Sequence, residues 1–239
     1  MTGGSRGLGR AVVRSLASRG YRIAFCYRSD GDAARDCTAE IRDRFGVEPL
    51  AIQSDVTQET QRRALVETVH SALGGLDVLV NNAGTTEDGV ALRMREAWDR
   101  VIDLDLTAPF RLAQLAIRHM MRAAWGRVIT IGSIASRIGF AGQVNYTAAK
   151  AGVEGMTRSL AQEYGRRGIT VNTVSPGFVE TDLTREAGAL ARRYTEDYSA
   201  LGRCVTPEAV AAAVVFLASD DAWAITGQTI NVDGGLVKL

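Results

Sequence analysis

Hydrophobic and polar positions along this chain switch repeatedly between a helical period and a strand period. In residues 10–19, Val12, Val13 and Leu16 fall on one helical face, and residues 21–27 form an apolar run of strand length. This alternation predicts an α/β fold: a doubly wound parallel sheet with helices on both faces. The same patterns predict further helices over 32–45, 60–73, 98–122, 144–166 and 207–219, and further strands over 49–54, 76–81, 127–132, 170–175 and 229–232.

We expect one domain over residues 1–239, because no linker, internal repeat or low-complexity stretch divides the chain. Residues 177–201 break the alternation and mix polar with aromatic side chains. Insertions of this kind often act as lids.

The chain opens with a glycine-rich turn where a strand is expected. A dinucleotide-binding turn of this form follows the first, central strand of a sheet, but here it begins at Thr2. Either the true start lies upstream of Met1 or the protein lacks a core strand, and we favour the upstream start. We expect the chain from Met1 alone to be poorly folded or unstable, because the neighbouring strands would lose backbone partners.

Charge and composition exclude several classes of protein. The formal net charge is +1, with no basic run, so nothing favours binding to nucleic acid or to an anionic membrane. No secretory signal is visible and the apolar runs are too short to span a bilayer, so we expect a cytoplasmic protein. The three cysteines and two histidines lack metal-ligand spacing, and no metal site is expected.

Residues 2–9 read Thr-Gly-Gly-Ser-Arg-Gly-Leu-Gly and lead directly into the first predicted helix. Glycines at 3, 7 and 9 permit positive φ angles and close approach of a pyrophosphate, whose charge the helix N-terminus stabilises. A glycine-rich turn that only caps a helix would look similar. The spacing differs from a nucleoside-triphosphate loop, and no lysine follows.

The end of the strand over 21–27 indicates which dinucleotide would bind. A protein that prefers NAD places Asp or Glu there to hold the ribose 2′-hydroxyl. This chain instead has Tyr27 followed by Arg28, and Arg6 lies inside the glycine turn. Two guanidinium groups can flank a 2′-phosphate, although solvated surface arginines would look the same. The missing carboxylate and the two arginines favour NADP(H).

Two later strands also end in turns that suit a cofactor. Asp55-Val56 follows one of them, where an acid can accept a hydrogen bond from an adenine amino group. Asn81-Asn82-Ala83-Gly84 ends the next, and its short side chains let the backbone pass close to a ligand. Either turn could equally be an ordinary strand-to-helix turn. Only the order of these turns along the chain favours a cofactor site.

Together these motifs resemble the short-chain dehydrogenases/reductases. The glycine turn, the Asn81–Gly84 turn, Ser133, Tyr146-x-x-x-Lys150 and Pro176-Gly177 occur in the order of that family over the whole chain. Segments 126–133, 142–146, 168–172 and 224–235 are most similar to the 3-oxoacyl-[acyl-carrier-protein] reductases. The resemblance implies a Rossmann-type fold, NADPH as the cofactor and a homotetramer formed through the two long helices and the C-terminal strand.

The resemblance also assigns the site. It implies that Ser133, Tyr146 and Lys150 are catalytic, with Asp105 in the same group. The residues expected to bind the cofactor are Gly3, Ser5, Arg6, Gly7, Leu8, Gly9, Arg28, Asp55, Val56, Asn82, Ala83, Gly84, Tyr146, Lys150, Pro176, Gly177, Val179 and Thr181.

The residue types suit the reduction of a ketone. Tyr146 and Lys150 share a helical face, and a phenol, with an ordinary pKa of about 10, needs a nearby ammonium to transfer a proton quickly at neutral pH. Ser133 can donate a hydrogen bond to the substrate carbonyl while Tyr146 supplies the proton. The alternative is that Tyr146 and Lys150 are an ordinary pair on an amphipathic helix. The chain disfavours this alternative, because it has only two lysines and uses arginine at its other basic positions.

Two positions depart from the family pattern. Asp105 stands where the family often has an Asn that helps to hold a water chain to the lysine. If the side chain matters, the charge would raise the pKa of Lys150 and move the pH optimum; if only the backbone carbonyl holds the water, Asp is tolerated. Carrier-protein reductases also tend to present two arginines to the acidic carrier. Arg167 matches one, and Ala124 replaces the other.

Three functions remain open at this point. The first is reduction of a 3-oxoacyl thioester, on a carrier protein or coenzyme A, in fatty-acid or polyketide-type synthesis. The second is reduction of a free small ketone or aldehyde. The third is NADP(H) binding without catalysis, as a sensor or scaffold, which the intact Ser133, Tyr146 and Lys150 disfavour.

Overall fold

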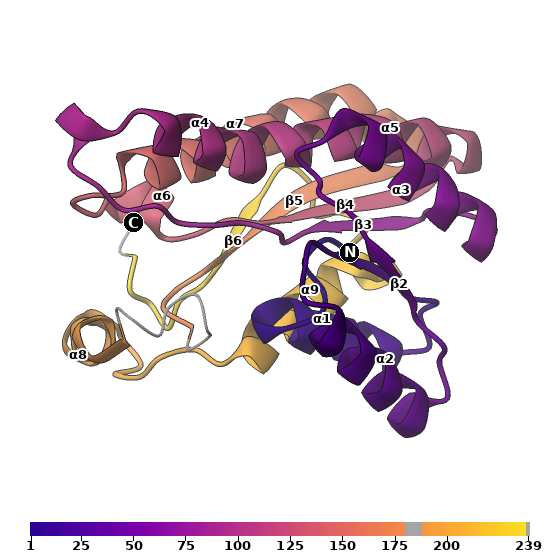
Figure 1. Ribbon diagram of the computed structural model, residues 1–239, viewed down its shortest axis with the longest axis horizontal. Coiled ribbons are helices and arrows are strands. Elements are labelled where there is room, and N and C mark those ends of the chain that lie inside the picture. The colour runs from indigo at the N-terminus through magenta and orange to yellow at the C-terminus, as the bar shows by residue number, and fades with distance from the viewer. Residues whose placement is uncertain (180–187, 238–239) are drawn as a thin grey trace.

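The computed structural model describes residues 1–179 and 188–237, which form a parallel α/β fold with helices on both faces of the sheet (Figure 1). The strands are β1 (Ala24–Tyr27), β2 (Leu50–Gln53), β3 (Val78–Asn81), β4 (Gly126–Ile131), β5 (Ile169–Pro176) and β6 (Thr229–Val232). The α-helices are α1 (Gly7–Ala17), α2 (Gly31–Phe45), α3 (Glu59–Leu73), α4 (Glu96–Ile102), α5 (Ala108–Ala123), α6 (Ala135–Ile138), α7 (Val144–Tyr164), α8 (Gly188–Tyr198) and α9 (Pro207–Ala218).

Helices α3, α4, α5 and α7 cover one face of the sheet, and α1, α2 and α9 cover the other (Figure 1). Each face has its own apolar core. Phe25, Val12 and Val214 belong to the core beneath α1, α2 and α9, whereas Val128 and Met120 belong to the core beneath α3 and α5. None of the helices in the described part of the chain combines the length and the apolarity needed to cross a bilayer.

The predicted elements are all present, with small differences at their ends. The helix predicted over 98–122 is divided into α4, a π-helical turn over Asp103–Thr107, and α5. The pattern did not predict α6 or α8. Helix α8 lies inside the segment interpreted as a lid, and residues 180–187 of that segment are outside the described residues.

The π-helical turn has a local cause. Pro109 lies in the first turn of α5 and has no N–H to donate to the carbonyl of Asp105, four residues earlier. The N–H of Ala108 donates instead to the carbonyl of Asp103, five residues back. The wider turn therefore lies at Asp105, the residue that departs from the family pattern.

The sheet is interrupted where the first strand was expected. Strands β1 and β2 pair with each other, and β3, β4, β5 and β6 form a separate run in that order, all parallel. The first strand is not wholly absent, however. Met1 and Thr2 occupy its last two positions: the Cys26 N–H donates to the Met1 carbonyl at 2.9 Å, and the Thr2 N–H donates to the Val80 carbonyl at 3.0 Å.

Candidate active site

The glycine turn and the turn after β3 are fixed to each other by hydrogen bonds from Thr2 and Asn82. Thr2 Oγ1 accepts from the N–H groups of Asn82 and Ala83, both at 2.9 Å. Asn82 Nδ2 donates in return to the carbonyls of Thr2 at 3.1 Å and Gly3 at 3.0 Å. Two segments predicted separately from the sequence therefore form one surface at the carboxyl ends of the strands.

The glycine positions in this turn are sterically required. Gly3 and Gly7 have φ angles of +63° and +52°, and a Cβ on Gly9 would lie 1.9 Å from the Gly3 carbonyl oxygen. Helix α1 starts at Gly7, and the residue before it, Arg6, makes no side-chain capping bond. The first N–H groups of α1 therefore lack a side-chain cap and suit an anion. Ser5 is buried and Leu8 is half-buried.

Arg6 and Arg28 are both exposed, and neither guanidinium makes a hydrogen bond or ion pair with any described residue. Arg28 follows β1 directly, and the Gly4 N–H donates to the Cys26 carbonyl at 3.2 Å, which ties the glycine turn to that strand end. Both cations are therefore available to a ligand phosphate near α1.

The predicted adenine contact at Asp55 is partly used by the protein. Asp55 Oδ1 accepts from the Thr57 N–H at 2.9 Å and from Thr57 Oγ1 at 2.7 Å, in a local turn. Its other carboxylate oxygen has no partner among the described residues. Val56 is buried, and its carbonyl accepts from the buried Arg62 guanidinium at 2.7 Å. The turn after β2 is therefore rigid and still has one acceptor free.

The most buried polar group of the site is an ion pair between Lys150 and Asp105. Lys150 Nζ lies 2.9 Å from Asp105 Oδ1, and their side chains are 6% and 0% exposed. Lys150 Nζ also donates to the Ile131 carbonyl at 3.1 Å, and Asp105 Oδ2 accepts from the Thr85 N–H at 3.0 Å. Gly84 permits this approach, because a Cβ there would lie 2.6 Å from Asp105 Oδ1.

The ion pair keeps Lys150 charged. Burial by itself lowers the pKa of Lys150, but the nearby charge of Asp105, together with Tyr146, raises that pKa above its ordinary value. Lys150 Nζ lies 5.4 Å from the centre of the Tyr146 ring, one helical turn away on α7. The predicted pair of Tyr146 and Lys150 therefore shares a face, and Asp105 completes the group from the π-helical turn.

Ser133 follows β4, and its Oγ accepts from the Ala135 N–H at 3.1 Å. Both Ser133 and Tyr146 are half-buried.

The sequence interpretation missed Glu154, which positions the loop after Ser133. Glu154 is buried on α7 and accepts from Ser136 Oγ at 2.6 Å and from Arg137 Nε at 3.1 Å. Ser136 Oγ also bonds the Ser133 carbonyl at 2.7 Å. The sequence does contain a pattern that indicates Glu154. Tyr146, Lys150 and Glu154 are spaced four residues apart and so share one helical face.

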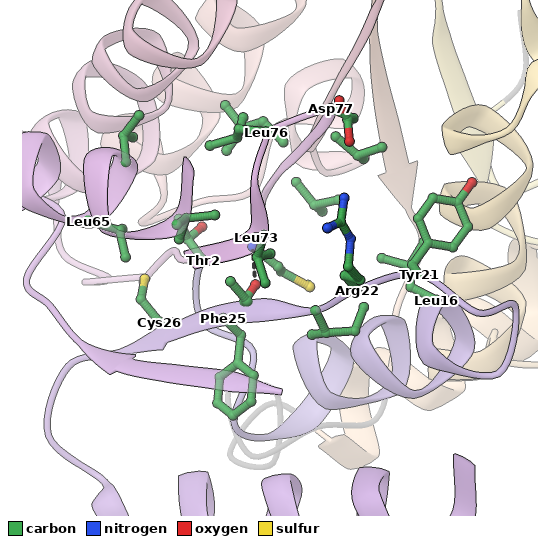
Figure 2. Close-up of a pocket in the computed structure, with 18 of the residues that line it drawn as sticks. Thr2, Leu16, Tyr21, Arg22, Phe25, Cys26, Leu65, Leu73, Leu76 and Asp77 are labelled. Carbon is green, nitrogen blue, oxygen red and sulfur yellow. Dashed lines mark hydrogen bonds between the residues drawn. The ribbon is translucent and has the colours of Figure 1, made fainter. Parts of the chain in front are cut away.

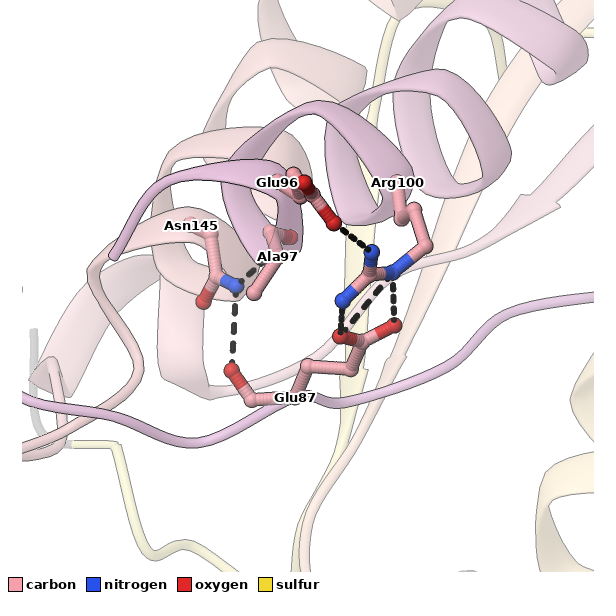
Figure 3. Close-up of polar contacts among 5 residues, drawn as sticks. All are labelled: Glu87, Glu96, Ala97, Arg100 and Asn145. Atoms are coloured by element: carbon pink, nitrogen blue, oxygen red, sulfur yellow. Dashed lines mark hydrogen bonds and ion pairs between the residues drawn. The ribbon is translucent and has the colours of Figure 1, made fainter. Parts of the chain in front are cut away.

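Asn145 was missed as well, and it joins the segment after β3 to the start of α7 (Figure 3). Its buried Nδ2 donates to the carbonyls of Glu87 at 3.1 Å and Ala97 at 3.2 Å. Arg100 pairs with the side chains of Glu87 and Glu96 beside it. Nothing in the spacing distinguishes Asn145 from an ordinary helix-start residue, because its partners are backbone carbonyls distant in sequence.

The remaining predicted residues follow β5. The Pro176 carbonyl accepts from the Ile134 N–H at 3.2 Å, so this strand end lies beside the Ser133 loop. A Cβ on Gly177 would lie 2.8 Å from the Asp233 Cα, so the chain passes close to the segment after β6. Val179 is buried and forms an isolated bridge with Val205. Thr181 lies outside the described residues.

Comparisons with known proteins show the family of the chain. A family model described as enoyl-(acyl carrier protein) reductase matches residues 3–237. The 3-oxoacyl-[acyl-carrier-protein] reductase FabG of Vibrio harveyi is 41% identical over 99% of this chain and 95% of its own length. FabG of Escherichia coli strain K12 shows the same identity and coverage, and FabG of Staphylococcus aureus strain Mu50 is 42% identical over 99% of this chain and 96% of its own length. The chain therefore belongs to the short-chain dehydrogenase/reductase family, as the order of its motifs predicted.

Proposed function

We propose that this protein uses NADPH to reduce a 3-oxoacyl thioester to the 3-hydroxyacyl form, in the cytoplasm, during fatty-acid or polyketide-type synthesis. The single observation that carries the proposal is the Tyr146–Lys150–Asp105 group beside Ser133, at the edge of the sheet where the glycine turn lies. The names of the FabG relatives support the choice of a 3-oxoacyl group on a carrier protein as substrate.

The described residues fit the cofactor. The uncapped start of α1, the close approach at Gly9 and the free cations of Arg6 and Arg28 suit a pyrophosphate and a 2′-phosphate. Asp55 would accept from the adenine amino group, and Asn82, Ala83 and Gly84 would line the path between the two ends of the cofactor. When bound, NADPH supplies the hydride.

Side chains of the protein then stabilise the charge that develops on the substrate and supply the proton. As the substrate carbonyl is reduced, its oxygen gains negative charge, and the Ser133 hydroxyl donates a hydrogen bond to it. Tyr146 transfers its phenolic proton to that oxygen. Lys150 stays protonated through Asp105 and stabilises the phenolate that forms on Tyr146.

We propose two kinds of binding partner: an acidic carrier protein and further copies of this chain. Arg167 is exposed beyond the end of α7 and would contact the acidic carrier protein, with Arg166 and Arg122 exposed as well. We also propose a homotetramer formed through α5 and α7, because a hollow between these helices is lined by Leu106, Phe110, Met156 and Leu160.

A substrate comparison tests the proposed function. Purified protein is mixed with NADPH and, separately, an acetoacetyl thioester, a small free ketone and a 2-enoyl thioester, and the loss of NADPH absorbance is followed. We expect the acetoacetyl thioester to give by far the highest kcat/KM. Preference for the free ketone would favour the second hypothesis from the sequence, and binding of NADPH with no turnover on any substrate would favour a non-catalytic role.

Arg28→Ala tests the cofactor preference. We expect the variant to bind NADPH about 10- to 150-fold more weakly, because a charge-assisted hydrogen bond to phosphate contributes roughly 1.5–3 kcal/mol. Binding of NADH should barely change. Arg19→Ala, at the opposite end of α1, is the matched control and should alter neither. Equal use of NADH and NADPH by the unmodified protein would refute the assignment.

Tyr146→Phe tests the proton donor. The variant should keep its fold and its affinity for NADPH but lose about 10²- to 10⁴-fold in kcat, the usual contribution of general acid catalysis. Lys150→Arg should also be severely impaired, because guanidinium has a different geometry and hardly ever releases a proton. Tyr164→Phe, at the other end of α7, serves as the control. Substantial activity of Tyr146→Phe at saturating substrate and cofactor would show that another group is the acid.

Asp105→Asn tests the ion pair through the pH dependence of kcat. The charged and titratable groups that face Lys150 are Asp105 and Tyr146, and the carboxylate raises the Lys150 pKa. Removing that charge lowers the pKa of Lys150, so the ammonium is lost sooner as the pH rises. We expect the alkaline limb of the profile to move to lower pH. An unchanged profile would mean that only the backbone of residue 105 matters.

A further inference from the structure

Three exposed aromatic side chains form a continuous row on the surface, and we call Phe140, Tyr194 and Tyr198 the aromatic row. The Phe140 ring meets the Tyr194 ring edge to face, with ring centres 6.5 Å apart. The Tyr194 and Tyr198 rings lie 4.8 Å apart, one helical turn from each other on α8. The three residues are 38%, 38% and 57% exposed, although their rings are apolar.

The first member of the row lies between two catalytic residues on the chain. Phe140 follows α6, after Ser133 and before Tyr146. The Gln143 N–H donates to the Phe140 carbonyl at 3.0 Å and closes a turn there. Helix α7 begins directly after this turn, with Tyr146 in its first turn. The row therefore starts in the loop that joins the two catalytic hydroxyls.

Helix α8 is held at the same edge of the sheet through its C-terminal end. The Leu201 N–H, just beyond α8, donates to the Gly234 carbonyl at 3.0 Å. Gly234 belongs to the segment after β6, which passes close to Gly177, and the strand before Gly177 ends beside the Ser133 loop. Helices α6 and α8 accordingly lie at one end of the sheet (Figure 1). The whole row borders the active site.

The exposure of these rings has no polar cause within the described part of the chain. Neither the Tyr194 nor the Tyr198 hydroxyl makes a hydrogen bond with a described residue, so no polar contact holds the rings at the surface. Contiguous apolar side chains that stay exposed mark a place where a ligand or a partner binds.

The apolar cavity between β1 and β3 is not an alternative place for an apolar part of the substrate (Figure 2). Leu16 of α1 and Leu65 and Leu73 of α3 line it. Ser133 and Tyr146 are not among its described lining residues. An apolar group attached to a carbonyl at these two hydroxyls is therefore better matched by the aromatic row.

We propose that the aromatic row binds the acyl group of the substrate and favours an acyl group that ends in an aromatic ring. On the proposed function, on which this inference rests, the reacting carbonyl lies at Ser133 and Tyr146, and two arms extend from it. The thioester arm leads to a polar carrier, whereas the acyl arm is apolar. The acyl arm is the one that matches the row.

The preference for a ring follows from the geometry of the row. Aromatic pairs favour edge-to-face or offset arrangements with ring centres about 4.5–7 Å apart, and they contribute free energy beyond the area that they bury. Phe140 and Tyr194 already have this arrangement, and a substrate ring placed on either one would extend it. A saturated ring of equal size would bury a similar area without that contribution.

The experiment compares two thioesters that differ only in their terminal ring: 3-oxo-5-phenylpentanoyl and 3-oxo-5-cyclohexylpentanoyl. In both, two CH₂ groups separate the ring from the ketone, so the ketones are equally reactive. The acetoacetyl thioester, which has no ring, is the third substrate. With NADPH present, kcat and KM are measured for the unmodified protein and for Phe140→Leu, Tyr194→Leu and Tyr194→Phe. Phe216→Leu, at a 46% exposed position on α9, is the control, and Tm is recorded for each variant.

The unmodified protein should prefer the phenyl thioester by roughly 2- to 10-fold in kcat/KM, the size that an aromatic pair contributes. Phe140→Leu and Tyr194→Leu should lose most of this preference, mainly through KM, because the contact is remote from the reacting carbon. Tyr194→Phe keeps the ring and should keep the preference, as should Phe216→Leu. Turnover of the acetoacetyl thioester and Tm should barely change in any of these variants.

Equal kcat/KM for the phenyl and cyclohexyl thioesters in the unmodified protein would overturn this role of the row. Equal losses on all three thioesters in Phe140→Leu and Tyr194→Leu would also overturn it, because the row would then only hold α8 in place. Neither result touches the proposed function as long as the acetoacetyl thioester is reduced. Absence of turnover with that thioester would instead refute the proposed function itself.

Discussion

The shape of the active site depends on the hydrogen bonds that Met1 and Thr2 make across the middle of the sheet. Strands β1 and β2 lead to Arg28 and Asp55, which we propose contact the 2′-phosphate and the adenine amino group. Strands β3, β4 and β5 lead to the turns that meet Lys150 and Ser133. Within the described residues, backbone pairing between these two parts of the sheet runs through Met1 and Thr2. Thr2 also orients the turn after β3 through its hydroxyl. Changes in this short connection therefore alter the distance between the two halves of a dinucleotide site.

A second constraint on the active site is that its buried charges must be neutralised. Lys150 and Asp105 are both withdrawn from water, and either one alone would carry a large desolvation penalty. Glu154, one turn farther along α7, is likewise buried and is balanced by Arg137. Helix α7 thus carries two buried charges that partners from other elements must neutralise. This requirement fixes the π-helical turn and the loop after Ser133 against the same helix face.

Much of this arrangement could be predicted from the sequence, because it depends on local signals. The alternating periods gave the order of helices and strands, and the spacing of Tyr146 and Lys150 placed them on one helix face. Other features depend on contacts between distant segments. Asn145 bonds backbone carbonyls of Glu87 and Ala97, which no side-chain pattern reveals. The family resemblance placed Asp105 near Lys150, but whether its side chain or its backbone mattered stayed open, because the two residues lie on different helical segments. The long helix is split because Pro109 interrupts an otherwise regular apolar pattern.

The π-helical turn makes the length of this helical region critical. A helix advances by about 100° per residue, so a π-helical turn acts as one residue inserted into a continuous α-helix. Residues before it set the rotation of α4 against α7, and residues after it set the buried face of α5, including Leu112 and Ala116. Deleting one residue here would restore a regular helix, but it would turn either the Asp105 carboxylate away from Lys150 or the apolar side of α5 away from the sheet. A single-residue insertion or deletion in this region would therefore disrupt one of these two contacts.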